Sequence, residues 1–204
     1  SDELPKFFQA LQDEENGSMR DYFLISLLTG ARRANVLGLR WADINFTRNE
    51  WRIEETKNGE SQTVPLTLEV VGILKERKKQ ADSVFIFPGV GKSGHMVEPK
   101  SGWKRILKRA GLEDLRIHDL RRTLGSWQAA SGSSLPIIGK SLNHKNASTT
   151  SIYARLDIDP VRKSVETANE AILKAANKPI EPTHGKILPI PKKRQSVFFQ
   201  NGIN

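Results

Sequence analysis

Apolar residues recur at three- and four-residue intervals through most of the chain, so the hydrophobic pattern predicts a mainly helical protein. Helices are expected over most of residues 2–28, and Thr29-Gly30 ends the second of them because glycine is the usual helix stop. Further helices are expected at residues 33–39, 67–79, 103–110, 117–130 and 160–173, with two short ones that begin at Ser134 and at Thr149 or Thr150.

The pattern changes in the middle of the first half, where short runs with strand composition replace the helical spacing. Strands are expected at residues 44–46, 51–56 and 61–65. Asn58-Gly59 separates the last two strands, and this pair predicts a tight hairpin because both residues tolerate positive φ. The predicted fold class is therefore α+β and mainly α, with a small three-stranded antiparallel sheet.

Two segments of the second half carry more detailed expectations. Residues 84–87 are an apolar run that suits either a strand or a buried loop, and a glycine-rich loop follows at 88–99. In the helix expected at 117–130, Leu120, Leu124 and Trp127 have core spacing, so all three are expected to face inward.

Length and composition limit the kinds of protein that this chain can be. Its 204 residues make one ordinary domain or two small ones, and 37% hydrophobic residues are normal for a globular chain. The absence of cysteine excludes disulfides, thiolate metal sites and cysteine nucleophiles. No apolar stretch approaches the roughly 18 residues of a membrane span, and the acidic N-terminus is unlike a signal peptide. Because the chain begins at Ser1 without a Met, we expect it to be a fragment of a longer protein.

The charge of the chain is concentrated in its second half. The formal net charge is +9; residues 1–102 carry 14 basic and 15 acidic side chains, whereas residues 103–204 carry 18 and 8. A basic half joined to a neutral half suggests an anionic partner. Nucleic acid is the first candidate and an acidic membrane surface the second, while a solvated basic surface is the plain alternative.

Two cations in the first half are candidates for phosphate chemistry. Arg32 lies at the start of a short helix, beside unpaired backbone N–H groups, and this position suits a phosphate. Lys57 precedes the predicted hairpin, whose tip can carry a side chain to a bound ligand. The commoner outcome for both residues is an exposed side chain without a function.

The second half contributes two histidines, an arginine and a tyrosine. His118 and Arg121 are three residues apart and share a helix face, where they can bind a phosphate oxygen, although chance gives this spacing in roughly a third of comparable sequences. Tyr153 follows His144 by nine residues in a polar, basic stretch. Tyr22, the other tyrosine, lies among apolar residues and is expected in the core. A core position also remains the alternative to a chemical role for Tyr153.

Taken in order, these residues resemble the catalytic signature of the tyrosine recombinases, the phage-integrase family. The matching segments are Thr-Gly-x-Arg, a lysine before a hairpin, His-x-x-Arg and His-x8-Tyr, and the flanking sequence at residues 37–43 and 64–67 is similar too. The resemblance covers about residues 4–176 and implies the helical catalytic domain of that family. The set consists of Arg32, Lys57, His118, Arg121, His144 and Tyr153.

Two positions depart from the pattern of the family. Asn35 stands three residues after the first arginine, where an acidic residue is usual, and we expect this exchange to affect the rate rather than the type of reaction. Asn143 stands before the second histidine, where glycine is usual. Asparagine is the next-best residue for positive φ, so the backbone is expected to keep its shape.

The resemblance implies that the protein cleaves and rejoins DNA through a 3′-phosphotyrosyl intermediate. Tyr153 would be the nucleophile, Arg32, Arg121 and His144 would bind the phosphate, His118 would act as the base, and Lys57 would protonate the departing 5′-oxygen. It implies no metal and no other cofactor, because the cations supply the positive charge, and no ATP, because the covalent link conserves the bond energy.

The resemblance also implies partners and a setting. The implied partners are double-stranded DNA and other protomers of the same protein in a tetrameric synapse, with no membrane. The implied location is cytoplasmic and nucleoid-associated, for a bacterial or phage-encoded protein. The implied role is the integration or excision of a phage or another mobile element. Residues 1–177 are expected to form the catalytic domain, and residues 178–204 an extended tail that either docks on a neighbouring protomer or stays unpaired. The rival functions are a type IB topoisomerase-like relaxing enzyme and a non-catalytic DNA-binding module.

Overall fold

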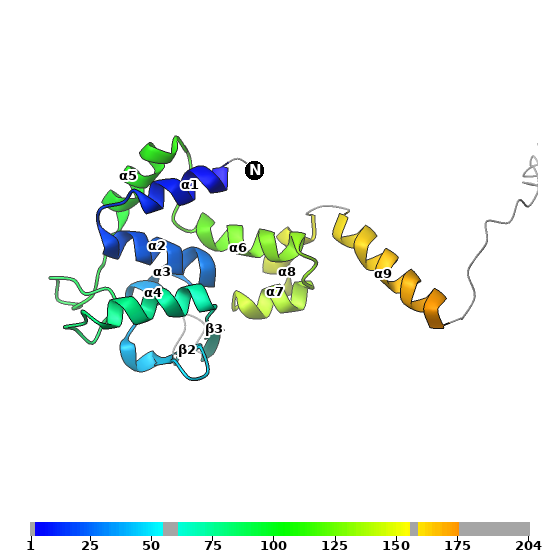
Figure 1. Ribbon diagram of the computed structural model, residues 1–204, viewed down its shortest axis with the longest axis horizontal. Helices are drawn as coiled ribbons and strands as arrows, with labels where there is room; N and C mark the ends of the chain where they lie inside the picture. Colours follow the sequence, from blue (N-terminus) through cyan, green and yellow to red (C-terminus); the bar gives the residue numbers. More distant parts are fainter. Residues whose placement is uncertain (1–2, 55–60, 156–158, 176–204) are drawn as a thin grey trace, which may run out of the picture. The chain divides into compact units, whose positions relative to one another are not determined.

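The computed structural model describes residues 3–54, 61–155 and 159–175 of the chain (Figure 1). Within these residues the protein is mainly helical with one small antiparallel sheet, which confirms the predicted fold class. The elements, with η for a 3₁₀ helix, are α1 (Glu3–Gln12), α2 (Gly17–Thr29), α3 (Arg33–Leu37), η1 (Trp41–Asp43), β1 (Ile44–Asn45), β2 (Glu50–Ile53), β3 (Gln62–Pro65), α4 (Leu68–Lys78), α5 (Lys100–Ala110), α6 (Asp119–Ala130), α7 (Leu135–Ser141), α8 (Ala147–Thr150), η2 (Ser151–Arg155) and α9 (Asp159–Ala175).

The chain divides into two compact units, Ser1–Ser164 and Val165–Asn204, and α9 spans the boundary between them. The helix expected at residues 160–173 is confirmed, and apolar side chains of α9 such as Val165 and Ile172 are exposed. None of the helices in the described ranges is both long and apolar enough to cross a membrane.

Local sequence signals fix both ends of α2. The side chain of Asn16 accepts a hydrogen bond from the backbone N–H of Met19, which satisfies one of the free donors at the start of the helix. Gly30 ends the helix in the left-handed conformation with a φ of 59°, as the sequence predicts. This sharp end turns the chain directly into Arg32 and α3.

The sheet has the strand order β1-β2-β3. Trp51 of β2 is paired with Val64 of β3. Directly paired residues of neighbouring strands point to the same face of a sheet, and both of these side chains are buried on the face that packs against the core. The predicted Asn58-Gly59 hairpin lies outside the described residues. Residues 84–87 form a loop rather than a strand, with an isolated bridge between Phe85 and Arg40; only its second half is buried, since Ile86 and Phe87 lie in the core whereas Val84 is exposed.

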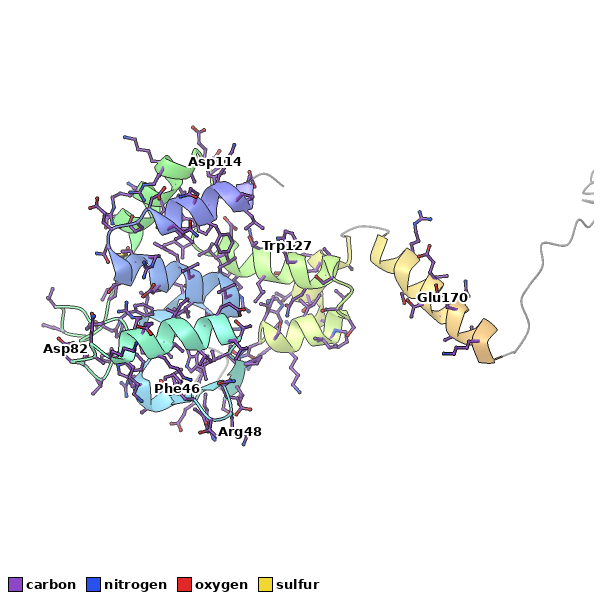
Figure 2. All side chains as sticks on the ribbon, in the orientation of Figure 1. Phe46, Arg48, Asp82, Asp114, Trp127 and Glu170 are labelled. Carbon is purple, nitrogen blue, oxygen red and sulfur yellow. The ribbon has the colours of Figure 1, made fainter. Side chains whose placement is uncertain are left out.

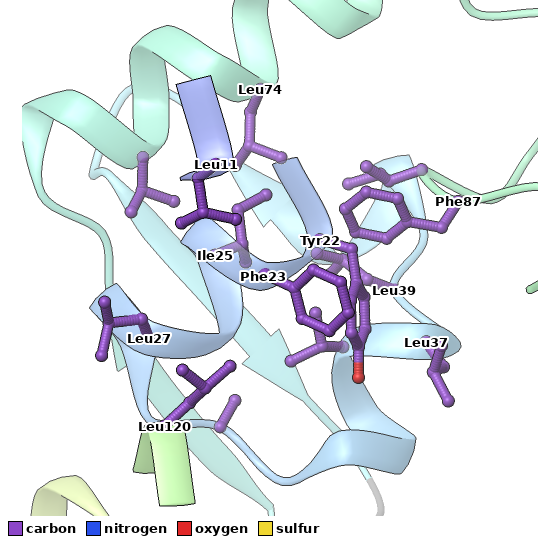
Figure 3. Packing of buried hydrophobic residues seen from close by; sticks show 14 of the residues in the cluster. Leu11, Tyr22, Phe23, Ile25, Leu27, Leu37, Leu39, Leu74, Phe87 and Leu120 are labelled. Carbon is purple, nitrogen blue, oxygen red and sulfur yellow. The ribbon is translucent and has the colours of Figure 1, made fainter. Parts of the chain in front are cut away.

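Aromatic residues hold the main core together. The rings of Tyr22 and Phe23 on α2 lie 5.0 Å apart, and Tyr22 also contacts Phe87 edge to face at 5.6 Å. Figure 3 shows these rings surrounded by leucine and isoleucine side chains. Trp103 of α5 packs against Phe23 and against Phe7 of α1, so the first helices of the chain and α5 share one core. Tyr22 is therefore a core residue, as predicted.

A second, smaller core lies between α6, α7 and η2. Its buried members are Ala129, Ile138, Leu142 and Tyr153, and Leu124 packs against them. Leu120 of the same helix belongs to the main core, so α6 joins the two clusters. Figure 1 shows α6 next to the end of α2, with which it is in contact, and α7 below α6 in this view.

The expectation that Trp127 faces inward is wrong. Its side chain is 54% exposed and projects from α6 (Figure 2). It lines a groove of about 300 Å³ together with Leu4 and Phe7 of α1. The groove is open to solvent, and the indole forms part of its wall rather than of the core.

The expected helix cap before Tyr153 is also wrong. Asn146 caps α8 in an extended conformation, and Thr149 and Thr150 lie inside this helix. Tyr153 follows on the 3₁₀ helix η2 rather than on an α-helix. Asn146 makes no side-chain hydrogen bond to the helix, and Thr150 is buried with its hydroxyl at the imidazole of His144.

A buried carboxylate ties the turn after α1 to α5. The side chain of Glu14 is 2% exposed, and its oxygens lie 2.7 Å from Arg105 Nη2 and 3.5 Å from Arg109 Nη1. The hydrogen bond from Arg105 is the main reason why the pKa of Glu14 lies below its ordinary value of 4.5. Arg109 also donates to the carbonyl of Ala10, so the two helices are joined at three points.

Replacing Glu14 by Gln is expected to lower the free energy of unfolding at pH 7 by about 1–3 kcal/mol, measured by urea denaturation. Because folding lowers the pKa of Glu14, its contribution is fully present above pH 4.5 and is lost as the pH falls through the lower folded value. The difference between the two proteins should therefore shrink below pH 4.5. Glu15→Gln, at an exposed neighbour, is the control; equal losses for both variants at pH 7 would contradict the assignment.

Candidate active site

The guanidinium of Arg121 joins three separate segments of the chain. Arg121 is 5% exposed, its Nη1 donates to the carbonyl of Gly30 at 2.6 Å, and its Nη2 donates to the carbonyl of Leu142. These carbonyls end α2 and α7, where helices leave acceptors unsatisfied and carry partial negative charge. Burial, with the nearby charge of Arg32, lowers the pKa of Arg121 to about 10, so the group stays protonated at neutral pH.

Arg32 approaches the same place from the start of α3. Its Nη2 donates to the carbonyl of Asn143 at 2.7 Å, one residue beyond the carbonyl that Arg121 binds. Its Nη1 is buried and makes no hydrogen bond with any residue that the structure describes. A buried cationic N–H group without an acceptor is costly unless a ligand supplies one.

The backbone before His144 has the predicted shape. Asn143 adopts a φ of 50°, which confirms that this position has the positive φ expected of it. The backbone N–H of His144 then donates to the carbonyl of Gly139 at 2.9 Å. The imidazole lies next to α8, with its Nδ1 3.0 Å from Thr150 Oγ1.

The surroundings of both histidines of the set favour the neutral form of the ring. Burial, together with the charges of Arg121, Arg32 and His118, lowers the pKa of His144 to about 4. His118 remains accessible at the start of α6, and partial desolvation with the charges of Arg121 and Arg122 lowers its pKa as well. The positive charge of the site therefore resides on the arginines.

Tyr153 packs its ring in the small core and brings its hydroxyl to α6. It is 5% exposed, and its ring is parallel to the imidazole of His144, with centroids 6.5 Å apart. A Cβ atom at Gly125 would lie 2.8 Å from the phenol oxygen, so the hydroxyl rests against the turn of α6 that follows Arg121. Burial raises the pKa of Tyr153 above 10, and the charges of Arg121 and Arg122 oppose this shift.

The structure thus brings together five of the six residues that the sequence singles out, although they are spread over more than a hundred positions. Lys57 lies outside the described residues. The sheet that leads to it does meet the site, since Gln62 of β3 donates to the carbonyl of Ser141 at 3.0 Å. The five residues are Arg32, His118, Arg121, His144 and Tyr153.

Sequence reasoning missed two residues that shape this site. Gly125 leaves room for the phenol of Tyr153. The pattern of apolar and polar residues in a helix does not show that one of its glycines contacts a residue 28 positions later in the chain. The hydroxyl of Thr150 contacts the imidazole of His144. From the sequence alone, a threonine at this position is equally consistent with a helix cap.

The protein belongs to the phage integrase family, because the family model matches residues 1–159. The prophage integrase IntF of Escherichia coli (strain K12) is 31% identical over 86% of this chain and 39% of its own length. The tyrosine recombinase XerA of Pyrococcus furiosus is 29% identical over 82% of this chain and 60% of its own length. The chain spans about half the length of the curated relatives it matches.

Solved structures share the fold. The XerH site-specific recombinase bound to difH substrate matches with a TM-score of 0.66 at 21% identity, over 79% of this chain and 51% of that one. The catalytic domain of bacteriophage HP1 integrase matches with a TM-score of 0.61 at 19% identity, over 80% of this chain and 90% of that domain. The chain therefore has the fold of a tyrosine-recombinase catalytic domain, as expected.

Replacing Arg121 by Lys is expected to destabilise the protein by about 2–3 kcal/mol, even though the charge is kept. A lysine ammonium cannot donate to two carbonyls that end different helices in the way that the planar guanidinium does. Urea denaturation measures the change. Arg122→Lys is the control on the next residue, which is exposed and pairs with Asp119, and it should cost no more than about 0.5 kcal/mol. Equal costs for the two variants would contradict the structural role of Arg121.

Proposed function

We propose that this chain is the catalytic part of a site-specific DNA recombinase that cleaves and rejoins DNA through a tyrosine. The observation that carries the proposal is that Arg32, Arg121, His118 and His144 lie close enough to influence one another's charge, with the ring of Tyr153 beside His144 and Arg121. A phosphodiester is anionic and gains charge in the transition state, so a site of desolvated cations favours its reaction.

The arginines are suited to bind the scissile phosphate. Nη1 of Arg32 is buried without an acceptor among the described residues, and a nonbridging phosphate oxygen would supply one. Two donors of Arg121 are directed to carbonyls, which fixes the orientation of the guanidinium and leaves further N–H groups for an anion. A planar guanidinium held in this way does not reorganise when charge develops on the phosphate.

The covalent step transfers the phosphate from DNA to the protein. Tyr153 Oη attacks phosphorus and forms the P–O bond of a 3′-phosphotyrosine, while the bond between phosphorus and the 5′-oxygen breaks. Only about one phenol in a thousand is ionised at pH 7 when its pKa is 10, and burial makes this fraction smaller still. Tyr153 therefore needs a base, and His118 is suited to this role because burial and the charges of Arg121 and Arg122 lower its pKa and favour the neutral ring.

The departing 5′-oxygen takes its proton from Lys57. The contact between Gln62 and Ser141 supports this assignment, because it places the strand after the predicted hairpin beside the end of α7. Crowding by the arginines would lower the pKa of the ammonium and make its proton easier to transfer. Attack by a 5′-hydroxyl of a partner duplex on the phosphotyrosine then completes strand exchange and releases Tyr153.

The partners follow from this chemistry. The substrate is double-stranded DNA, and the excess of basic residues after position 102 supports binding to its phosphates. Exchange between two duplexes requires several protomers, which we propose form a tetrameric synapse. Exposed apolar residues of α9, Val165 and Ile172, support a contact with another protomer. The biological role would be integration or excision of a phage or another mobile element.

Tyr153→Phe is expected to abolish the covalent protein–DNA adduct on nicked DNA while the dissociation constant for DNA changes by no more than about twofold. The phenyl ring fills the same space in the small core, but it cannot form the phosphate ester. Denaturing gel electrophoresis of trapped complexes and a binding titration measure the two quantities. Tyr22→Phe, at the only other tyrosine, is the matched control and should keep the adduct. Undiminished trapping by Tyr153→Phe would remove Tyr153 as the nucleophile.

Lys57→Ala is expected to slow cleavage of normal DNA by roughly a hundredfold or more, which is the usual contribution of general acid catalysis. A substrate with a bridging 5′-sulfur has a leaving group that needs no proton, so its cleavage should be nearly unaffected. Single-turnover rates on the two substrates give the comparison, and Lys92→Ala, at an exposed loop lysine, is the control. An equal loss on both substrates would contradict the acid role of Lys57.

A further inference from the structure

Thr150 holds the imidazole of His144 from the side of α8. Its Oγ1 lies 3.0 Å from Nδ1 of the ring, and Thr150 is 3% exposed. Water therefore has little access to replace the hydroxyl as the partner of Nδ1. The sequence motif of the family contains His144 and Tyr153, and the proposed chemistry gives Thr150 no part.

The position of the hydroxyl is fixed by α7 as well as by α8. A Cβ atom at Gly139 would lie 3.0 Å from Thr150 Oγ1, so the hydroxyl sits directly against the backbone of α7. The carbonyl of Gly139 also accepts the backbone N–H of His144 at 2.9 Å. The hydroxyl and the backbone of His144 are thus held against the same residue.

The hydroxyl proton of Thr150 is available to the ring. A threonine hydroxyl inside a helix often donates to the carbonyl four residues earlier, as Thr29 does to Ile25 at 2.6 Å and Thr123 to Asp119 at 2.9 Å. For Thr150, the hydrogen-bond partner found among the described residues is Nδ1 of His144.

A neutral imidazole has one donor nitrogen and one acceptor nitrogen, and the partner of one nitrogen decides the role of the other. Burial and the charges of Arg121 and Arg32 favour the neutral ring of His144, so its tautomer determines whether it can help to bind a phosphate. With the proton on Nε2 the ring donates to an anionic oxygen, whereas with the proton on Nδ1 it presents a lone pair that repels this oxygen.

We propose that Thr150 is a positioning residue whose hydroxyl donates to Nδ1 of His144 and thereby keeps the single ring proton on Nε2, directed to the phosphate. The inference rests on the proposed function, since it gives His144 the role of a phosphate donor. Thr150 itself touches neither the phosphate nor the nucleophile in this scheme.

The tautomer can be measured without DNA. In the 204-residue chain labelled with ¹⁵N-histidine, long-range ¹H–¹⁵N correlation spectra at pH 7 distinguish the two tautomers, and His144→Gln assigns the signals among the four histidines. We expect Nε2–H for His144 in the unmodified chain and in Thr150→Ser, and a mixture of tautomers in Thr150→Val. A proton on Nδ1 in the unmodified chain would overturn the inference, whether or not any variant folds.

The consequence for catalysis is measured as the rate of adduct formation at saturating DNA. Thr150→Val, which keeps the branched shape, should slow this rate ten- to a hundredfold with an unchanged dissociation constant, and Thr150→Ser should restore most of the rate. Thr149→Val, at the exposed neighbour on the same helix, is the control. In a His144→Gln background the valine exchange should cause no further loss; an additive loss would mean that Thr150 acts by another route and would overturn the inference.

The two measurements separate this inference from the proposed function. If the unmodified chain forms no adduct with any DNA, the proposed function fails, while the tautomer spectra still test whether Thr150 donates to His144. If adducts form normally but Thr150→Val is as fast as the unmodified chain, the proposed function stands and the positioning role is wrong.

Discussion

The arrangement of this site depends on one buried cation. The guanidinium of Arg121 donates to the carbonyls that end α2 and α7, and in doing so it holds Arg32, which follows α2, beside His144, which follows α7. The partial negative charge of two helix ends compensates a positive charge that burial would otherwise penalise. The same contact therefore stabilises the fold and keeps a cation in place for an anionic ligand.

The site separates its charge between two kinds of side chain. Arg121 stays protonated at neutral pH, whereas burial and, after it, the charges of nearby arginines lower the pKa of His118 and of His144. A neutral imidazole has one N–H group and one nitrogen lone pair, so it can donate a hydrogen bond and also accept a proton. A protonated imidazole has no free lone pair and cannot accept a proton. Burial and neighbouring cations thus act in the same direction on the two imidazoles, and both favour the neutral ring.

The sequence anticipated features that neighbouring residues decide. Gly30 and Gly111 end helices in the left-handed conformation, where glycine avoids a steric cost, and Asn143 tolerates a positive φ for a related reason. Expectations that depended on distant partners were less successful. Trp127 has core spacing, yet it lines an open groove beside α1. Tyr153 lies on a 3₁₀ helix that follows the short helix α8, where an α-helix capped by Thr149 or Thr150 was expected.

By itself the sequence determined the helices and strands, the mainly helical class and the six chemically suited side chains, because backbone preference and residue type are local properties. Tertiary structure alone decided that Arg121 is buried between two helix ends, that Gly125 admits the phenol, and that Thr150 supports His144. These relations join residues from α2, α6, α7 and η2, and only the packing of helices around two cores brings such segments within hydrogen-bond distance.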